Sequence, residues 1–246
     1  MRHYIEPFMG SACVFFDTAP TSASLSDFNA DLVLFFSELR DHPNDLIASL
    51  RSMHPEGDDY YDVRAQDASS LSPSRAAARF FYLNRFSFNG VYRTNRRGEF
   101  NVPRGARTGA IPGDAELLAA ASHLRQVNIT CCDYRQATAR AVHSDFVYLD
   151  PPYRNDSRET YGEYGYSSFG SAEDVAELGE ELRRLDAIGA RVLLSFNNDE
   201  GLETVLNEWN VIRVSRTRSV AAAATSRTAL MGEILAMNYE PEATLA

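Results

Sequence analysis

Residues 145–153 read Asp-Phe-Val-Tyr-Leu-Asp-Pro-Pro-Tyr, an apolar run between two acids that leads into consecutive prolines. A short apolar run bounded in this way predicts a buried β-strand over 145–149. Proline cannot donate to the hydrogen-bond ladder of a sheet, so the strand has to end near Asp150. Because open α/β sheets bind their ligands at the carboxyl ends of strands, Asp150 is a candidate site residue.

The first forty residues predict the opening half of a nucleotide-binding α/β unit. A strand at 4–5 leads into a turn that contains Gly10, and a helix follows this turn. A second strand over 23–26 ends at Asp27, and apolar residues at helical spacing predict a helix over 31–40. Asp27 follows Gly10 by 17 residues, the arrangement in which an acid meets the ribose of a nucleotide cofactor.

The rest of the chain predicts alternating strands and helices, which indicate a largely parallel sheet. Aromatic and arginine-rich residues over 86–103, with Asn-Gly and Arg-Gly turns, predict a β-hairpin, and polar residues over 54–74 predict a loop. Further helices are expected at 76–84, 114–126, 172–187 and 200–208, and further strands at 127–132, 190–195, 211–216 and 234–237.

Length and composition exclude several classes of protein. The 246 residues fit one α/β domain, or such a domain with a smaller insertion, and no apolar run is long enough to cross a membrane. Three cysteines form neither a disulfide framework nor a zinc knuckle, and the five histidines lack metal-ligand spacing, so no metal site is expected. We expect a cytoplasmic, monomeric protein without a membrane partner.

Charge is distributed unevenly along the chain. The net charge is −10, and all 24 basic residues are arginine, which fits either a GC-rich genome or a salt-adapted host. Residues 75–107 carry eight arginines against the single acid Glu99, and 209–232 carry four arginines and no acid. An acidic body with basic faces is typical of a protein that docks a polyanion at one place. The alternative is clustered, solvated surface charge; for Arg213 to Arg218 it is a charged edge strand.

The Asp150-Pro151-Pro152-Tyr153 tetrapeptide suits chemistry on an exocyclic amine. Such an amine is a weak nucleophile because its lone pair is delocalised into the ring. A carboxylate and a backbone carbonyl that accept its two N–H bonds would free this lone pair, and Tyr153 would stack on the flat base. The alternative is a plain turn after a strand.

Six motifs in order resemble the Dam-type family (D12 class, alpha group) of DNA adenine N6-methyltransferases. They are Glu-Pro-Phe-x-Gly at 6–10, Ser-Asp-Phe-Asn at 26–29, Tyr-Leu-Asn-Arg at 82–85, Asn-Gly at 89–90, Gly-Glu-Phe-Asn-Val-Pro at 98–103 and Asp-Pro-Pro-Tyr at 150–153. The resemblance implies a class I S-adenosylmethionine-dependent methyltransferase fold with a Rossmann-like sheet. It implies methyl transfer from S-adenosylmethionine to a flipped adenine in double-stranded DNA.

The resemblance also implies roles for individual residues. The catalytic residues would be Asp150, Pro151, Pro152 and Tyr153, and the cofactor would contact Glu6, Phe8, Gly10, Asp27, Asp133 and Asp150. Residues 52–112 would be a helical and β-hairpin DNA-recognition insertion in a catalytic domain of 1–51 and 113–246. DNA contacts would come from Arg85, Phe88, Asn89, Arg93, Asn95, Arg96, Arg97, Arg104 and Arg107, while Phe86, Phe88 and Tyr92 would supply wedges that help extrude the base.

Departures from the family pattern leave alternatives open. Ala12 stands where many relatives have a second glycine, and no Lys-Trp-Ala-Gly-Gly-Lys-like segment precedes the first strand. A DNA-binding remnant without cofactor is therefore one alternative, and a methyltransferase acting on RNA adenine or cytosine N4 is another. Residues 104–107 differ from the family's usual run after Val-Pro, so GATC is only a candidate recognition sequence. Whether a restriction nuclease accompanies the chain is open.

Overall fold

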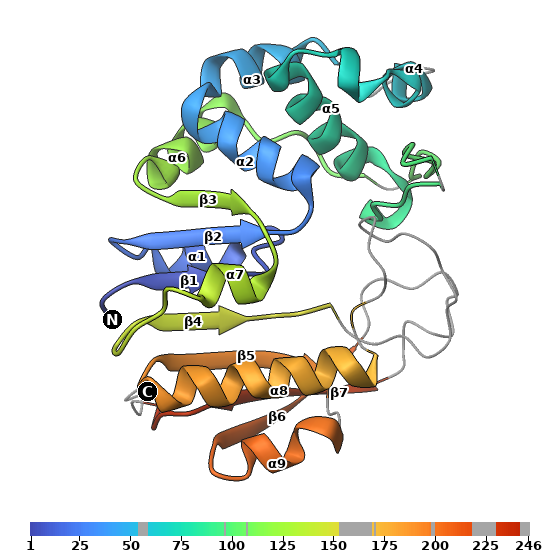
Figure 1. Ribbon diagram of the computed structural model, residues 1–246. Helices are drawn as coiled ribbons and strands as arrows, with labels where there is room; N and C mark the ends of the chain where they lie inside the picture. Colours follow the sequence, from blue (N-terminus) through green and yellow to red (C-terminus); the bar gives the residue numbers. More distant parts are fainter. Residues whose placement is uncertain are drawn as a thin grey trace.

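The computed structural model describes residues 1–53, 59–95, 97–106, 108–152, 169, 171–197, 200–217 and 230–241. Within these ranges the strands form one seven-stranded sheet in the order β3-β2-β1-β4-β5-β7-β6 (Figure 1). The strands are β1 (Tyr4–Glu6), β2 (Ala23–Asp27), β3 (Asn128–Cys131), β4 (Phe146–Leu149), β5 (Arg191–Asn197), β6 (Asn210–Thr217) and β7 (Leu230–Met237). All neighbours pair in parallel except β7, which is antiparallel to β5 and β6. The predicted α/β class, with a class I methyltransferase sheet, is confirmed.

Helices cover the sheet because its central strands are apolar on both faces. Helices α7 (Tyr134–Thr138), α8 (Ala172–Ala187) and α9 (Glu203–Leu206) lie on the face that is in front in Figure 1, and α1 (Cys13–Thr18) lies on the opposite face. Val147 and Leu149 of β4 are fully buried against Leu178 and Leu182 of α8. Burial of each such side chain contributes about 1.5–3 kcal/mol.

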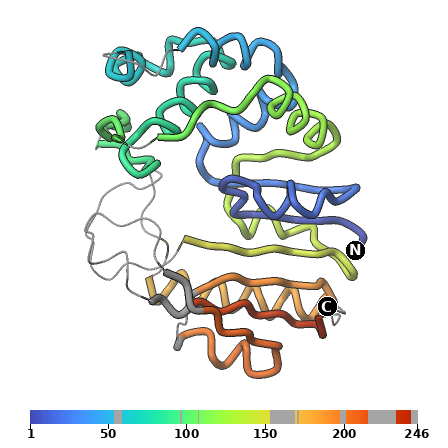
Figure 2. Tube along the Cα trace, turned by 180° about the vertical axis from the view of Figure 1, so that it is seen from behind, coloured from blue at the N-terminus to red at the C-terminus, as the bar shows by residue number. Residues whose placement is uncertain are grey.

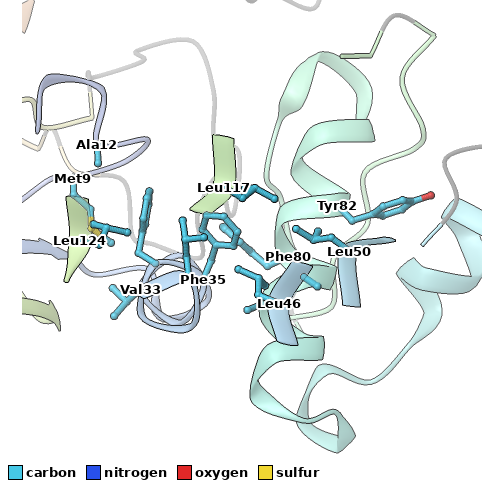
Figure 3. Close-up of a cluster of buried hydrophobic side chains, with 14 of the residues drawn as sticks. Met9, Ala12, Val33, Phe35, Leu46, Leu50, Phe80, Tyr82, Leu117 and Leu124 are labelled. Atoms are coloured by element: carbon cyan, nitrogen blue, oxygen red, sulfur yellow. The ribbon is translucent and has the colours of Figure 1, made fainter. Parts of the chain in front are cut away.

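A helical layer extends the molecule beyond the β3 edge of the sheet (Figure 1). It consists of α2 (Ala30–Asp41), α3 (Pro43–Arg51), α4 (Asp59–Ala65), α5 (Pro73–Phe86) and α6 (Asp114–Leu124), with short turns η1 (Ala68–Ser70) and η2 (Phe88–Gly90); η3 (Glu200–Leu202) precedes α9. Leu46 and Leu50 of α3 pack with Phe80 of α5, and the same cluster continues through Val33 to Leu124 (Figure 3). The layer therefore shares a hydrophobic cluster with Tyr4, Leu25 and Ile129 of the sheet, while the residues under α8 form a second cluster.

The prediction of a loop over 54–74 is wrong for its described part, because α4 and η1 lie there. Tyr60 and Val63 recur at helical spacing and are buried, while Asp59 and Asp62 favour the helix N-terminus. The helix is too short for its apolar stripe to stand out from the surrounding polar residues. Helix α3, which begins with Pro43, was also not predicted.

The predicted hairpin exists in a different form. Asn89 and Gly90 have φ of +57° and +66° and form the η2 turn, which redirects the chain after α5. The chain reverses at 95–99 instead, where the Asn95 N–H donates to the Glu99 carbonyl and the Gly98 N–H to the Asn95 carbonyl, each at 2.9 Å. Thr94 pairs with Phe100 in an isolated bridge. Of the two turns expected in the hairpin, Asn89-Gly90 therefore does not form its tip, and Arg93 lies on the arm before the tip.

No helix within the described ranges is long and apolar enough to cross a membrane.

Candidate active site

The turn after β1 is tied to the end of β2. The N–H of Met9 donates to the Ser26 carbonyl at 2.9 Å, and the N–H of Gly10 donates to Oδ2 of Asp27 at 3.2 Å. Gly10 has φ of +46°, a backbone conformation that side chains disfavour. A direct hydrogen bond therefore joins the two residues whose spacing predicts a nucleotide-binding turn.

Ala12 takes the left-handed conformation that a glycine would adopt more easily. Its φ is +53°, and its N–H donates to the Met9 carbonyl at 2.6 Å. A non-glycine residue in this region costs about 1–2 kcal/mol, but the Ala12 methyl group is fully buried in the core (Figure 3). The turn thus forms with alanine at this position.

Asp27 lies half-buried, with both carboxylate oxygens facing backbone amides. Oδ1 accepts from the Asn29 N–H at 2.9 Å. Burial raises the pKa of Asp27 above its usual value, and hydrogen bonds from the amides of Asn29, Gly10 and Phe28 oppose this rise. Each oxygen keeps a further lone pair, so the carboxylate can accept from two vicinal hydroxyls.

Two phenylalanine side chains, Phe28 and Phe8, lie beside this turn. Phe28 follows Asp27 directly and is 60% exposed, an unusual position for a phenylalanine. Phe8 stacks on Tyr134 of α7 with ring centroids 5.2 Å apart and meets Phe169 edge-on at 5.8 Å. Sequence reasoning singled out Phe8 but missed Phe28, although an aromatic directly after a strand-end acid was a usable signal.

Asp133 lies two residues beyond β3, the strand that pairs with β2. Its Oδ1 accepts from the N–H of Arg135 at 2.9 Å and so caps α7, and it also pairs with the Arg135 guanidinium at 3.0 Å. The register places Cys131 opposite Asp27, so Asp133 and Asp27 lie at the same edge of the sheet. Asp133 therefore has a capping role in addition to the predicted cofactor contact.

Asp150 follows β4, next to β1 in the sheet, and is exposed. Its neighbour Glu6 is only 2% exposed and accepts from the Tyr4 hydroxyl at 2.8 Å. Burial raises the pKa of Glu6 to about 7, and the charge of Asp150 adds to this rise. Pro151 is buried and Pro152 is exposed, while Tyr153 lies outside the described residues.

Several of the predicted DNA-contacting residues are engaged in hydrogen bonds or turns within the protein. Arg85 donates through Nε to the Ala110 carbonyl at 2.9 Å, and Arg93 donates through Nε to Oδ1 of Asn101 at 2.9 Å. The side chain of Asn95 is committed to its own turn, because Oδ1 accepts from the amides of Arg97 and Glu99. Asn89 provides the left-handed residue of η2. Arg97 is exposed and Arg104 is half-buried, and Arg96 and Arg107 lie outside the described residues.

The three aromatic residues proposed as wedges differ in their exposure to solvent. Phe88 is 43% exposed, as a wedge requires. Phe86 and Tyr92 are 3% and 8% exposed and pack into the helical core, so the prediction that they insert into DNA is wrong. Phe86 lies on the apolar face of α5 and packs against Tyr82, which fixes its ring inside.

A known protein family matches most of the chain. The sequence profile of the D12 class N6 adenine-specific DNA methyltransferases matches residues 1–220. The chain belongs to this family. Its members transfer a methyl group to DNA adenine, so the chain is an adenine-specific DNA methyltransferase.

Individual relatives agree with this assignment. The Type II methyltransferase M1.LlaDCHI of Lactococcus lactis subsp. cremoris is 33% identical, over 97% of this chain and 87% of its own length. The DNA adenine methylase of Escherichia coli is 32% identical, over 96% of this chain and 86% of its own. The Type II methyltransferase M.MjaIII of Methanocaldococcus jannaschii is 29% identical, over 97% and 89%.

In this methyltransferase not every arginine of the basic segment is available to DNA. Arg79 donates to the backbone carbonyls of Val63 and Arg64 at 2.9 and 2.7 Å, and burial lowers its pKa. Arg75 donates to Oγ of Ser52 at 2.7 Å. These two side chains fasten α5 to α4 and to the end of α3, so the charge that faces solvent is smaller than the sequence count.

The described residues directly after α5 lie near the edge of the sheet where Asp27 and Asp150 lie (Figures 1 and 2). The carboxyl ends of β1, β2 and β4 point toward the side on which α5 ends and residues 88–95 and 97–104 lie, as both views show (Figures 1 and 2). Among the described residues no group of three His, Cys, Asp or Glu side chains is arranged to hold a metal ion.

Proposed function

We propose that this methyltransferase uses S-adenosylmethionine to methylate N6 of an adenine extruded from double-stranded DNA, with Asp150 as its catalytic carboxylate. The observation that carries the proposal is the place of Asp150-Pro151-Pro152. This motif ends β4, beside β1 and the turn that Asp27 holds through Gly10. Ligands of open α/β sheets bind at this edge.

The residues at this edge fit the cofactor. A β-carbon on Gly10 would meet no atom within 4 Å, so a ligand has room to approach the backbone there. The Asp27 carboxylate suits a ribose diol, and the exposed Phe28 ring offers a flat apolar surface for an adenine. Phe8, Glu6 and Asp133 border the same edge, as the family resemblance implies. S-adenosylmethionine, when bound, supplies an electrophilic methyl group.

Asp150 would activate the target amine. Its carboxylate and a backbone carbonyl of the Asp150-Pro151 stretch accept the two N–H bonds of the adenine amine, which draws the nitrogen lone pair out of conjugation. Positive charge would develop on the amine nitrogen as it accepts the methyl group that S-adenosylmethionine would supply. The negative charge of Asp150 would stabilise it, and one amine proton would then pass to solvent water. Tyr153 would stack on the base.

DNA would be held by residues 52–112, the proposed recognition insertion. Arg85, Arg93, Arg97 and Arg104, with Arg96 and Arg107, would contact phosphates or guanine edges, and Phe88 would stack into the opened duplex. GATC is the first recognition sequence to test because of the hairpin resemblance.

One incubation tests the proposal and its alternatives. Labelled S-adenosylmethionine is offered with duplex DNA with and without GATC, and with RNA of the same sequence, and digested products are separated by mass spectrometry. We expect N6-methyladenine from duplex DNA. Label only in N4-methylcytosine or only in RNA would overturn the proposal. Calorimetry that finds DNA affinity but no heat with S-adenosylmethionine would favour the remnant without cofactor.

A further inference from the structure

Polar side chains form a row across four adjacent strands beneath Asp150. Register places Tyr4 opposite Phe146 and Tyr148 opposite Leu193. Because side chains alternate along a strand, Glu6 of β1, Tyr148 of β4 and Ser195 of β5 lie on one face of the sheet. Antiparallel pairing of β5 with β7 puts Glu233 on this face too, diagonally beside Ser195. Most of the remaining positions in these strands are apolar.

These side chains are joined end to end by hydrogen bonds. Oγ of Ser195 lies 2.9 Å from Oε1 of Glu233, and both residues are buried, at 3% and 9% exposure. The Tyr148 hydroxyl is hydrogen-bonded to Ser195 on one side and to the carboxylate of Asp150 on the other. The chain therefore runs from a buried carboxyl on β7, through two hydroxyls, to the exposed Asp150.

The direction of the hydrogen bonds orients this chain. Ser195 donates its hydroxyl hydrogen to Oε1 of Glu233. The Tyr148 hydroxyl brings one hydrogen and a carboxylate can only accept, so Tyr148 donates to Asp150. The buried Glu233 therefore fixes the Ser195 hydroxyl, which in turn contacts the Tyr148 hydroxyl.

We propose that Tyr148, Ser195 and Glu233 form a positioning chain that fixes the Asp150 carboxylate in the orientation needed for methyl transfer. The inference rests on the proposed catalytic role of Asp150. An exposed carboxylate rotates freely, and one directed hydrogen bond from Tyr148 restricts it. Tyr148 is itself fixed by Ser195, which Glu233 holds from the next strand.

Other titratable groups on this face have different partners. Tyr4 donates to Glu6, and the carboxylate of Glu6 also accepts from the Phe15 amide, so this pair on β1 is complete in itself. On β6 the register partner of Glu233 is Val214, which is apolar. The hydrogen bond from Tyr148 therefore links Asp150 to Ser195 and Glu233 and not to the Tyr4–Glu6 pair.

The experiment compares single-turnover methyl transfer with binding in four variants. Tyr148→Phe, Ser195→Ala and Glu233→Leu each break the chain and should slow single turnover by about tenfold or more, as expected for a lost hydrogen bond to a charged group. Glu233→Gln keeps an amide oxygen as acceptor for the Ser195 hydroxyl and should stay within about twofold of the wild type. Dissociation constants for S-adenosylmethionine and DNA should change less than about twofold in all four.

A matched control separates positioning from folding. Thr138 donates to the buried Glu181, another hydroxyl–glutamate pair, which lies between α7 and α8. Thr138→Val should lower the melting temperature as much as Ser195→Ala does, yet leave the single-turnover rate unchanged. Tyr148→Phe keeps the ring and so remains informative if Glu233→Leu fails to fold.

The outcomes are distinguishable. Wild-type single turnover in Tyr148→Phe, or a Glu233→Gln rate as low as that of Glu233→Leu, would overturn the positioning chain while leaving the proposed function intact. Undiminished methylation by Asp150→Ala, measured alongside, would instead overturn the proposed function.

Discussion

Tyr92 donates its hydroxyl hydrogen to Oδ2 of Asp31 at 2.5 Å, which joins the basic segment to the first turn of α2. The Tyr92 ring is buried between Phe80 and Phe100, with centroid distances of 5.2 and 5.4 Å. Asp31 follows Asp27 by four residues. The bond therefore attaches the proposed DNA-recognition segment directly beside the proposed cofactor turn.

Tyr92→Phe should lower the free energy of unfolding by about 1.5–3 kcal/mol, because a largely buried hydrogen bond to a charged group is lost. Urea titration followed by circular dichroism measures this. Tyr61→Phe is the matched control, since Tyr61 is 43% exposed and should change stability by less than about 0.5 kcal/mol. Equal stability of the two variants would mean that the hydroxyl of Tyr92 contributes nothing to the attachment.

Phe88→Ala should slow methylation of a matched duplex without lowering the melting temperature, because the side chain is 43% exposed. If the ring helps extrude the base, a duplex with a mismatched target adenine should partly restore the rate, since that base is already loosely stacked. Loss of melting temperature together with equal slowing on both duplexes would assign Phe88 to packing.

Neutralising Arg93, Arg96 and Arg97 to glutamine should weaken DNA binding and flatten its salt dependence. Each lost phosphate contact lowers the slope of log K against log salt by about 0.9. Arg125→Gln with Arg140→Gln removes exposed charge elsewhere and serves as control. An unchanged slope in the triple variant would place the docking surface outside 93–97.

Arg93→Ala alone should relax discrimination at one base pair by about 1–3 kcal/mol if its guanidinium reads a guanine edge. The present bond to Asn101 would then be exchanged for a base contact. Binding competition among duplexes with single base-pair changes measures this, and uniform weakening across all of them would make Arg93 a phosphate contact.

The stability of the free protein should depend on pH through Glu6. Its pKa is raised from 4.5 to about 7 on folding, so the folded state holds this proton more tightly. The stabilisation is complete below pH 4.5 and is lost as the pH rises through 7. Relative to Glu6→Gln, the wild type should lose up to about 1.4 kcal/mol per pH unit across this range. Parallel curves for the two proteins, with exposed Glu208→Gln as control, would contradict the buried, protonated Glu6.

Strands could be predicted from the sequence where an apolar run was long or ended in a distinctive motif. The run before Asp150 and the apolar stretches before Gly10 and Asp27 are local features, and the structure confirms the strands that they predict. Helix α8 was predicted at its observed bounds because its apolar face recurs over several turns.

Other features depend on contacts that local sequence does not record. Helix α4 is stabilised by burying Tyr60 against the helical core. The sequence alone does not distinguish the buried aromatic side chains of Phe86 and Tyr92 from the exposed one of Phe88. The tip at 95–99 is formed by hydrogen bonds to the Asn95 side chain. Asn89-Gly90 is the stronger turn signal in the sequence, so the role of Asn95 at the tip was not predicted. The Tyr148–Ser195–Glu233 row requires the strand order, because its members come from β4, β5 and β7.

The most direct test of the account is the single-turnover rate of Asp150→Ala with S-adenosylmethionine and duplex DNA, beside DNA affinity measured on the same preparation. We predict a rate reduced at least about a hundredfold, as for removal of one group that stabilises transition-state charge, with DNA affinity changed only a few-fold. Retention of more than about a tenth of the wild-type rate would contradict the catalytic role of Asp150.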